Sequence, residues 1–542
     1  MKTILTLVSR ETYLGRMQRP SRPRSSRIIA LICTLVLSPS LLFAASSGLA
    51  DRVIEHKLAN GMTVLMVERH QAPVVSLNMT FGVGGVNEQV GQTGLAHLYE
   101  HMAFKGTRTV GTKDYEKEKP VLDELHRVGT ELEQRQREFA RRSADMPVDA
   151  NEKAAIETLQ KRFKELQDQA LQYVSGNEMA LLYQRHGGVG LNASTGKDLT
   201  RYVISLPSNR LPLWAAIESD RMANPVLREF YKERGVVMEE RRLRNDDSPN
   251  GLLFETFTSA AFRAHQYGIP TIGWESDILS LTPAAAEAFF KTYYGPGRAT
   301  IGIVGDIDPK VVIALIENTF GKIPAAPSPP QIVTVEPPQR GERRVEVEFD
   351  AEPSLAIGFH KPGLGHPDDY VFDVMDELLT DGPTSRLYRQ LVREGRLAAS
   401  VHSDANYPGV RSANLFVLSA TPLAPHTTAE VEAAILAELE RLKTEPVSPT
   451  ELERIVNNLD ADMVRALRSN SGLASQLALY QTVAGDWHYV LKSRDKIAAV
   501  TPADIQRVAT QYFTKSNRTV ATLVKKTVAK QLATAAPREV AR

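Results

Sequence analysis

The stretch TPAAAEAFFKTYYGPGRATIGIVGDI, residues 282–307, has a second copy in this chain and decides the expected fold. The copy is TPADIQRVATQYFTKSNRTVATLV, which starts at Thr501, an offset of 501 − 282 = 219 residues. Further upstream, VVSLNMTF at Val74 matches PSLAIGFH at Pro353 in pattern, at an offset of 353 − 74 = 279 residues. The repeat predicts a chain built from two homologous halves.

The composition is that of a folded protein with more than one domain. The length of 542 residues suggests two or more domains, and a hydrophobic fraction of 42% excludes a fibrous or disordered chain. Charged residues make up 24% of the chain with a net charge of +1, and no long basic tract occurs outside the N-terminus. This balance predicts no nucleic-acid partner. Beyond the N-terminal leader, the sequence reads as alternating helices and strands.

The N-terminus has the pattern of a secretory signal peptide. Basic residues run up to Arg27, and a short, interrupted apolar run follows that ends in small residues by Ala50. We expect residues 1–50 to be removed, with cleavage after Ala44 or Ala50, and the mature protein to be periplasmic. The alternative is an inner-membrane anchor with the rest of the chain facing the periplasm. The only cysteine, Cys33, lies in this leader, so any metal must be held by His, Asp or Glu.

The two repeat offsets differ by 279 − 219 = 60 residues, so the first half is expected to carry an insertion of about that length. Residues 116–174 are the candidate. They form two strongly charged segments with apolar residues at three- and four-residue spacing, broken at Met146-Pro147. We interpret them as a helical hairpin that projects from the first half and is dispensable for its fold. A PAAPSPP stretch, residues 324–330, marks the linker between the halves.

The stretch GLAHLYEHMAFKGT, residues 94–107, carries the residues most suited to chemistry. On a helix, His97 and His101 lie on one face and can direct both imidazoles at one metal ion. Glu100 is adjacent on that face, close enough to reach a metal-bound water without binding the metal itself. This H-x-x-E-H order is the inverzincin motif of zinc peptidases. The alternative is a helix whose exposed face happens to be polar.

A catalytic zinc needs a third protein ligand, and the residues alone leave its identity open. REFYKERGVVMEERRLRND, residues 228–246, offers several candidates. Glu233 and Glu240 are two helical turns apart and share a face, while Glu239 points about 100° away from Glu240. A charged helix with several glutamates is more often simply solvated.

Five stretches together resemble the pitrilysin–insulysin family of zinc metallopeptidases, particularly its two-domain branch, which includes mitochondrial processing peptidase and bacterial relatives. They are GLAHLYEHMAFKGT, GGVGLNASTGKDLTRYVISLP, ESDRMANPV, ERGVVMEERR and AHQYGIPTIGW. With the repeat, the resemblance covers most of residues 51–525. It implies that Glu240 is the third zinc ligand and Glu233 a supporting residue. The interval of 240 − 101 = 139 residues between His101 and Glu240 exceeds the family's usual interval by about the length of the predicted insertion.

The resemblance also implies the fold class and the domain organisation. We expect an α+β protein of two homologous α/β-sandwich domains, each an antiparallel-rich sheet packed by helices, with the helical hairpin inserted in the first. The expected divisions are a zinc-binding peptidase domain at 51–323, a linker at 324–345, an inactive homologous domain at 346–525 and a tail at 526–542. Where the second half would repeat the motif, near residues 376 to 381, it reads DELLTD and offers no histidine.

Substrate-contacting residues are predicted less sharply. Asn192 and Ala193 resemble the family segment whose backbone pairs with an extended substrate as an added strand, and the alternative is an ordinary strand after a glycine turn. His265 and Tyr267 are expected to face the cleft, unless the histidine is a buried structural one. In the family, the second domain supplies an Arg and, seven residues later, a Tyr. Here Arg393 matches the Arg, but position 400 is Ser.

The function expected from these features is that of a zinc metalloendopeptidase with one Zn²⁺ per chain, acting on extended peptides or unfolded proteins. Glu100 would be the general base, with Glu233 and Arg393 assisting. The alternatives are a catalytically inactive partner subunit or peptide-binding scaffold, and a binding protein that docks through the hairpin. The resemblance further implies a homodimer, or a heterodimer with a zinc-free homologue, in which Arg393 acts on the partner's zinc.

Overall fold

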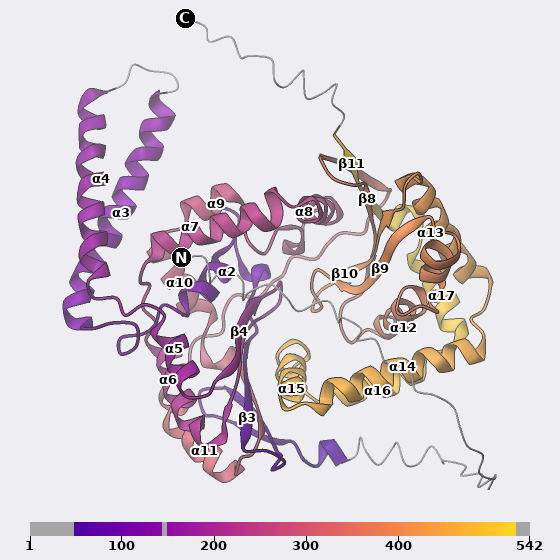
Figure 1. The fold of residues 1–542 in the computed structure, drawn as a ribbon, viewed down its shortest axis with the longest axis horizontal. Helices are drawn as coiled ribbons and strands as arrows, with labels where there is room; N and C mark the ends of the chain where they lie inside the picture. The colour runs from indigo at the N-terminus through magenta and orange to yellow at the C-terminus, as the bar shows by residue number, and fades with distance from the viewer. Residues whose placement is uncertain (1–47, 144–148, 527–542) are drawn as a thin grey trace, which may run out of the picture. The chain divides into compact units, whose positions relative to one another are not determined.

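The computed structural model describes residues 48–143 and 149–526 and contains two mixed β-sheets (Figure 1). The first sheet has the strand order β1-β2-β6-β3-β5-β4. Only its β2–β6 pair is parallel, and its other neighbouring strands are antiparallel. Its strands are β1 (Ile54–Lys57), β2 (Thr63–Glu68), β3 (Val74–Phe81), β4 (Val189–Thr195), β5 (Thr200–Pro207) and β6 (Ala299–Gly305).

The second sheet repeats the topology of the first. Its order is β7-β11-β8-β10-β9, again with one parallel pair, β7–β11, among antiparallel neighbours. Its strands are β7 (Arg343–Phe349), β8 (Ser354–Lys361), β9 (Ala398–Tyr407), β10 (Asn414–Pro422) and β11 (Arg518–Lys525). Apart from β1, the two orders correspond strand for strand, with β6 and β11 supplied by the repeated stretch. The predicted fold class of two homologous α/β halves is confirmed.

Helices cover both sheets. Those of the first half are α2 (Leu95–Met102), α3 (Tyr115–Ser143), α4 (Ala150–Leu171), α5 (Glu178–Arg185), α6 (Leu211–Ala223), α7 (Phe230–Arg241), α8 (Pro249–Ala261), α9 (Glu275–Ser280), α10 (Pro283–Tyr293) and α11 (Pro309–Asn318). Those of the second half are α12 (Asp369–Leu379), α13 (Thr428–Thr444), α14 (Pro449–Arg468), α15 (Asn470–Ala484), α16 (Tyr489–Ala498) and α17 (Pro502–Tyr512).

The repeated stretch folds alike in both halves for a local reason. Thr282 and Thr501 are the N-caps of α10 and α17, and each side-chain oxygen accepts a hydrogen bond from a first-turn amide. A proline follows each cap at the first helical position, where its missing N–H costs nothing. Each helix then leads through a short 3₁₀ turn into a strand inside its sheet.

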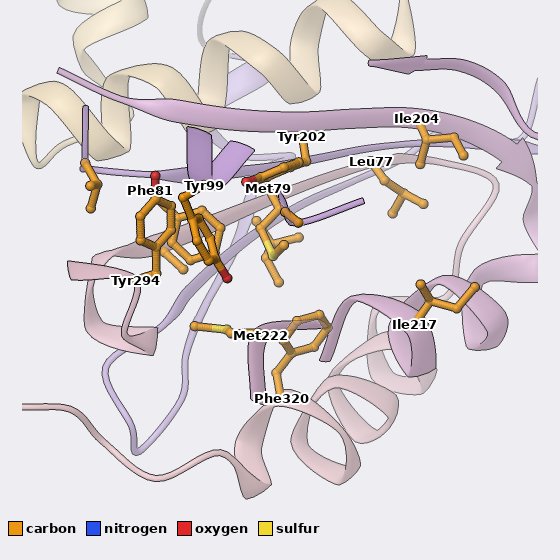
Figure 2. Packing of buried hydrophobic residues seen from close by; sticks show 14 of the residues in the cluster. Leu77, Met79, Phe81, Tyr99, Tyr202, Ile204, Ile217, Met222, Tyr294 and Phe320 are labelled. Atoms are coloured by element: carbon orange, nitrogen blue, oxygen red, sulfur yellow. The ribbon is translucent and has the colours of Figure 1, made fainter. Parts of the chain in front are cut away.

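The core of the first half forms where β3, β5 and β6 meet the helices on one face of the sheet. Figure 2 shows the aromatic side chains of Phe81, Tyr99 and Tyr294 close together, with Met222 and Phe320 beneath them. The Phe81 and Tyr294 rings are 5.2 Å apart, and those of Tyr99 and Tyr294 are 4.5 Å apart. Because Tyr99 lies on α2, this packing fixes the helix that carries the H-x-x-E-H motif.

Each half covers the other half's sheet with one helix. Helix α15 packs on β3 and β6, and α8 packs on β7, β8 and β11. Glycine permits the close approach: a Cβ at Gly302 of β6 would lie 2.3 Å from the Ala474 carbonyl oxygen of α15. A Cβ at Gly358 of β8 would likewise lie 2.5 Å from the Phe257 ring of α8. The two halves are therefore joined by an exchange of helices as well as by the chain.

Residues 116–174 form the predicted helical hairpin, with α3 and α4 antiparallel and side by side (Figure 1). The predicted break at Met146-Pro147 lies outside the described residues. The base of the hairpin is buried, contrary to the expectation of an appended arm. Glu118 of α3 is 0% exposed and pairs with Arg228, which is 1% exposed, at 2.7 Å. The base of the hairpin is thus tied to the first half by a buried ion pair, and removing it would leave Arg228 buried without its counter-charge.

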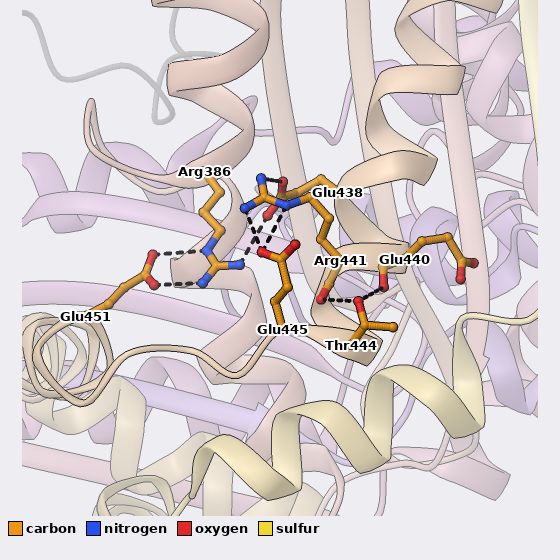
Figure 3. A network of polar contacts seen from close by, with 7 residues as sticks. All are labelled: Arg386, Glu438, Glu440, Arg441, Thr444, Glu445 and Glu451. Carbon is orange, nitrogen blue, oxygen red and sulfur yellow. Dashed lines mark hydrogen bonds and ion pairs between the residues drawn. The ribbon is translucent and has the colours of Figure 1, made fainter.

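A polar network ties the helices of the second half together (Figure 3). Arg386 makes a bidentate contact with Glu451 at the start of α14, at 3.0 and 2.7 Å, and also reaches Glu438 of α13 at 3.2 Å. Arg441 on α13 shares Glu438 and pairs with Glu445. The network thus links the segment before the π-helical turn η7 (Tyr388–Glu394) to both helices.

Most of the predicted signal peptide lies outside the described residues. Within the part of the chain that the structure describes, no helix is both long and apolar enough to cross a membrane. Residues 324–342 form neither helix nor strand, whereas residues 343–345, the last three of the linker predicted at 324–345, already belong to β7. Residues 324–342 are nonetheless held in place, since Glu336 accepts hydrogen bonds from three consecutive backbone amides, those of residues 263–265.

Candidate metal centre and active site

The helix that carries the motif begins at a fixed point. Gly94 precedes α2 with φ 89°, a left-handed conformation that disfavours other residues. Buried Glu88 accepts hydrogen bonds from the backbone amides of Gly94 at 2.8 Å and Ala96 at 2.7 Å. These contacts satisfy amides that an isolated helix start would leave unpaired. Helix α2 is therefore anchored at its N-terminus directly before His97.

Three ligand atoms converge between α2 and α7. Glu240 Oε2 lies 3.2 Å from His101 Nε2 and 3.7 Å from His97 Nε2. The three residues offer ligand atoms that all lie within 4.8 Å of one another. Neighbouring ligands of a tetrahedral zinc with bonds of about 2.1 Å are separated by about 3.4 Å. The spacing therefore fits one zinc ion, and a fourth position would remain for water or substrate.

The charge distribution of the site also suits a cation. Burial lowers the pKa of His97 to about 4, so its imidazole is neutral, as a metal ligand must be. Burial also acts to lower the pKa of His101, but hydrogen bonds to Glu233 and Glu240 outweigh it and raise the pKa to about 9. Two carboxylates thus stabilise positive charge at His101. A bound zinc ion would supply that positive charge in place of the proton.

Glu233, for which the family resemblance implies a supporting role, contacts His101. His101 Nδ1 lies 2.9 Å from Glu233 Oε1, and a carboxylate only accepts, so the imidazole donates here and leaves Nε2 for the metal. Lys105 Nζ pairs with the other oxygen of Glu233 at 2.6 Å. Burial acts to raise the pKa of Glu233, but His101 and Lys105 outweigh it and lower the pKa to about 2, so this carboxylate stays ionised.

Glu100 lies on the ligand helix with its carboxyl group buried. It is 9% exposed and accepts a hydrogen bond from the Thr195 hydroxyl at 2.7 Å. Burial raises its pKa, and the Thr195 contact partly opposes this shift. A carboxylate whose pKa is shifted upward is a better proton acceptor at neutral pH than an exposed one. The position and environment of Glu100 suit a general base.

A cavity of about 360 Å³ opens beside His97. Both halves line it. Phe254 and Thr258 come from α8, Tyr407 is the last residue of β9, and Pro408 follows that strand. Thr258 and Tyr407 are hydrogen-bonded to each other at 3.1 Å across the two halves. A cavity of this size beside a metal site can take one substrate side chain.

Asn192 and Ala193 lie on β4, the edge strand of the first sheet. They pair with Val203 and Tyr202 of β5, and β4 has no further neighbour in this sheet. Thr195, which contacts Glu100, lies at the end of the same strand. The open side of β4 can therefore accept an added peptide strand that leads toward the metal centre.

His265 and Tyr267 do not face the cavity, and the expectation that they contact substrate is corrected. They are 4% and 0% exposed and contribute nothing to the cavity lining. The Tyr267 hydroxyl donates to Asp198 and accepts from the backbone amide of Ser412, so it joins the two halves. His265 Nδ1 accepts from the Tyr267 amide as the cap of a 3₁₀ turn. The Tyr267 hydroxyl and His265 Nδ1 thus make structural contacts, while the buried His265 Nε2 has no hydrogen-bond partner among the described residues.

Arg393 is not part of this chain's metal site. Its side chain is 49% exposed on η7 and contacts the Pro383 carbonyl and Glu394. Ser400 stands at the position where the family has Tyr. It lies on the edge strand β9 and pairs with Thr421 of β10. Neither residue lines the cavity beside His97. Any catalytic part for Arg393 would therefore have to be played outside its own chain's site.

The second half carries carboxylates where the first half carries its metal ligands. Glu377 of α12 and Asp381, two residues beyond the end of that helix, lie close to Asp462 of α14. Helix α12 follows β8 as α2 follows β3. This group contains no nitrogen donor.

Three contacts of the metal site were not predicted from the sequence. They are Thr195 on Glu100, Lys105 on Glu233, and Arg244, whose Nη1 lies 2.6 Å from Glu240 Oε1. The spacing of Glu240 and Arg244, four residues apart on a helix with opposite charges, is a signal that was available. Thr195 and Lys105 contact residues distant in sequence, so no local pattern points to them.

Family models match both halves of the chain. A model described as insulinase (peptidase family M16) matches residues 63–132 and 169–275, and one described as peptidase M16 inactive domain matches residues 280–459. Residues 133–168, within the hairpin, are left unmatched. The two sheets of equal topology and the H-x-x-E-H helix facing a glutamate from a second helix define a zinc-peptidase fold of the inverzincin class. The chain belongs to peptidase family M16.

Several relatives are named as zinc proteases. The chain is 28% identical over 473 residues to zinc protease PqqE of Helicobacter pylori, covering 85% of this chain and 90% of that protein. A crystal structure of a protease from Helicobacter pylori has a TM-score of 0.72 and 27% identity, covering 87% of this chain and 99% of that one. The first half of the periplasmic protease PqqL from Escherichia coli shares the fold, with a TM-score of 0.63, 18% identity and coverage of 89% and 93%.

Proposed function

We propose that the protein is a zinc-dependent endopeptidase that hydrolyses extended peptides or unfolded polypeptides. The observation that carries the proposal is the convergence of His97 Nε2, His101 Nε2 and Glu240 Oε2 on one point. It is supported by the buried carboxyl group of Glu100 on the same helix and by the relatives, several of which are named as zinc proteases. The arrangement provides three ligands and a base, as a hydrolytic zinc site requires.

When bound, zinc lowers the pKa of a coordinated water and polarises a peptide carbonyl. The chain's own residues bind the substrate, transfer the proton and orient a metal ligand. The backbone of Asn192 and Ala193 on β4 pairs with the extended substrate and presents its scissile bond. Glu100 accepts a proton from the attacking water and delivers it to the departing amine. Glu233 keeps the His101 ring turned with Nε2 toward the metal position.

The decisive experiment replaces Glu100 with Gln. The variant keeps all three ligands, so we expect one zinc per chain, while cleavage of a quenched peptide falls by at least about 10²-fold, the usual contribution of a general base. Zinc content by atomic emission and turnover with and without a chelator are measured together. Glu239→Gln, an exposed site on α7, is the control and should match the wild type. Wild-type turnover in Glu100→Gln would refute the assigned base.

A non-catalytic role as partner subunit or scaffold is the second candidate, favoured by Ser400, which stands where the family has a tyrosine. In that case the wild-type protein would bind peptides through β4 but show no chelator-sensitive cleavage. The same quenched-peptide assay, combined with a peptide-binding measurement, separates the two candidates. The presence of the base and all three ligands favours the enzyme.

We further propose that the protein is exported to the periplasm and acts as a homodimer or with a zinc-free homologue. The apolar leader supports export, and PqqL, which shares the fold, is a periplasmic protease. The exposed guanidinium of Arg393 is available to act on a partner's zinc. Mass spectrometry of the N-terminus in a periplasmic extract tests cleavage near Ala44 or Ala50. Light scattering of the purified protein tests the oligomeric state.

A further inference from the structure

The two oxygens of the Glu240 carboxylate have different partners. Oε2 faces His101 and His97, at 3.2 and 3.7 Å. Oε1 lies 2.6 Å from Arg244 Nη1. A glutamate ligand that bound zinc through both oxygens would occupy the open coordination position. What holds Oε1 therefore bears on whether a water or substrate can reach the metal.

The backbone brings Arg244 to this place. Helix α7 ends at Arg241 and continues as a π-helical turn, η3 (Arg242–Asp246), a type of distortion that is frequent at functional sites. Arg244 lies on this turn and lines the cavity beside His97, so its guanidinium stands between the cavity and the ligand carboxylate.

The neighbouring arginines have other partners. Arg241 is buried, pairs with Glu255 and donates to the Gly273 carbonyl. Arg242 pairs with Glu239 and Asp247, both more than half exposed, and is itself 51% exposed, the same fraction as Arg244. Of these arginines, Arg244 is the one that contacts a metal ligand, and Arg242 provides a matched control.

We propose that Arg244 is a positioning residue that holds Oε1 of Glu240, so that the glutamate binds zinc through Oε2 alone and a fourth position stays open. The inference rests on the zinc site proposed above and adds to it the residue that sets how its acidic ligand binds. Arginine suits the task because its planar guanidinium fixes the direction of a carboxylate and stays protonated.

The positive charge of Arg244 and its positioning role have opposite effects on zinc affinity, so a measurement of zinc affinity distinguishes them. A cation next to a divalent metal repels it, so a purely electrostatic Arg244 would weaken zinc binding, and its removal would strengthen it. A positioning Arg244 has the reverse sign, because Glu240 without it rotates freely and loses its preset orientation. Removing a residue that orients a metal ligand typically costs 10- to 100-fold in affinity.

The experiment measures zinc dissociation constants by competition with a fluorescent chelator for the wild type, Arg244→Gln, Arg244→Lys and Arg242→Gln. We expect about tenfold weaker zinc binding in Arg244→Gln, a smaller loss in Arg244→Lys, and no change in Arg242→Gln. Cobalt(II) loaded into the same proteins gives a second readout. Its visible absorption should weaken in Arg244→Gln, as it does when a tetrahedral site gains a fifth ligand.

The possible results separate the positioning role of Arg244 from the zinc site itself. Equal or tighter zinc binding in Arg244→Gln, with an unchanged cobalt spectrum, would overturn the positioning role while leaving the zinc site intact. Absence of stoichiometric zinc in the wild-type protein would instead refute the proposed function. Thermal unfolding of the metal-free variants shows whether they are folded. We expect them to be folded, because the Arg244 side chain is half-exposed.

Discussion

At the scale of single residues, neighbouring carboxylates on α7 have separate tasks because the helix turns them to different sides. Glu240 is directed at His97 and His101, whereas the Glu239 side chain is 55% exposed and pairs with Arg242. We expect Glu240→Ala to bind zinc at least about 10²-fold more weakly and Glu239→Ala to bind it as the wild type does. Equilibrium dialysis with zinc distinguishes them. The opposite pattern would show that the ligand assignment is displaced by one residue.

The sequence alone could not make this assignment. The motif spacing in α2 predicted His97, His101 and Glu100 because side-chain direction follows directly from helix periodicity. The third ligand comes from a helix more than a hundred residues later, and periodicity does not say which face of α7 meets α2. The family resemblance supplied Glu240, and the structure places it. Arg244 and Thr195 remained unseen because their roles depend on that packing.

At the scale of elements, the base of the hairpin is tied to the first half by a buried ion pair. Fully buried Glu118 of α3 pairs with Arg228, whose guanidinium also reaches the carbonyls of Lys105 and Val110 in the loop after α2. Glu118→Ala should lower the free energy of unfolding by about 3–5 kcal/mol, because it leaves a buried charge unpaired. Chemical denaturation measures this loss. Glu116→Ala, an exposed position two residues earlier on the same helix, should stay within about 0.5 kcal/mol of the wild type.

The distal part of the hairpin should behave differently. Its described residues are mostly exposed, and Arg234 and Tyr231 of α7 contact the hairpin closer to its base, at Glu133 and Phe163. Replacing residues 136–154 with a short Gly/Ser linker should therefore preserve zinc binding and cleavage of a small peptide. Zinc titration and turnover of the shortened protein test this, with large unfolded substrates compared alongside. Loss of zinc would mean that the tip also supports α7.

Periodicity predicted the two helices of the hairpin but not the depth at which they are buried. Their exposed faces are strongly charged, and the buried residues Leu122, Leu125 and Val128 recur at helical spacing in the sequence. That spacing equally describes two helices that pack only on each other. The burial of Glu118 could not be predicted from the sequence. A glutamate is almost never fully buried unless it is paired, and the partner of Glu118 lies 110 residues away.

At the scale of the whole molecule, the repeat predicted two halves but not the exchange of helices between them. The similarity of residues 282–307 and 501–524 follows from shared strands and caps, which are local. Whether an apolar helix face covers its own sheet or its neighbour's is decided by chain paths that a single sequence does not reveal. Gly302 and Gly358 mark the two exchange contacts, yet in sequence each is only a glycine within a strand.

The exchange predicts that neither half is stable alone. Residues 51–323 without α15 would expose one face of β3 and β6, and residues 324–526 without α8 would expose one face of β8 and β11. Expressed separately, each half should be aggregated or lack a cooperative thermal transition, and co-expression should restore a soluble complex that binds zinc. A full-length chain cut by an engineered protease site within residues 324–330 is the control, and it should remain associated. A separately expressed first half that unfolds cooperatively and binds zinc with wild-type affinity would show that its sheet does not need α15.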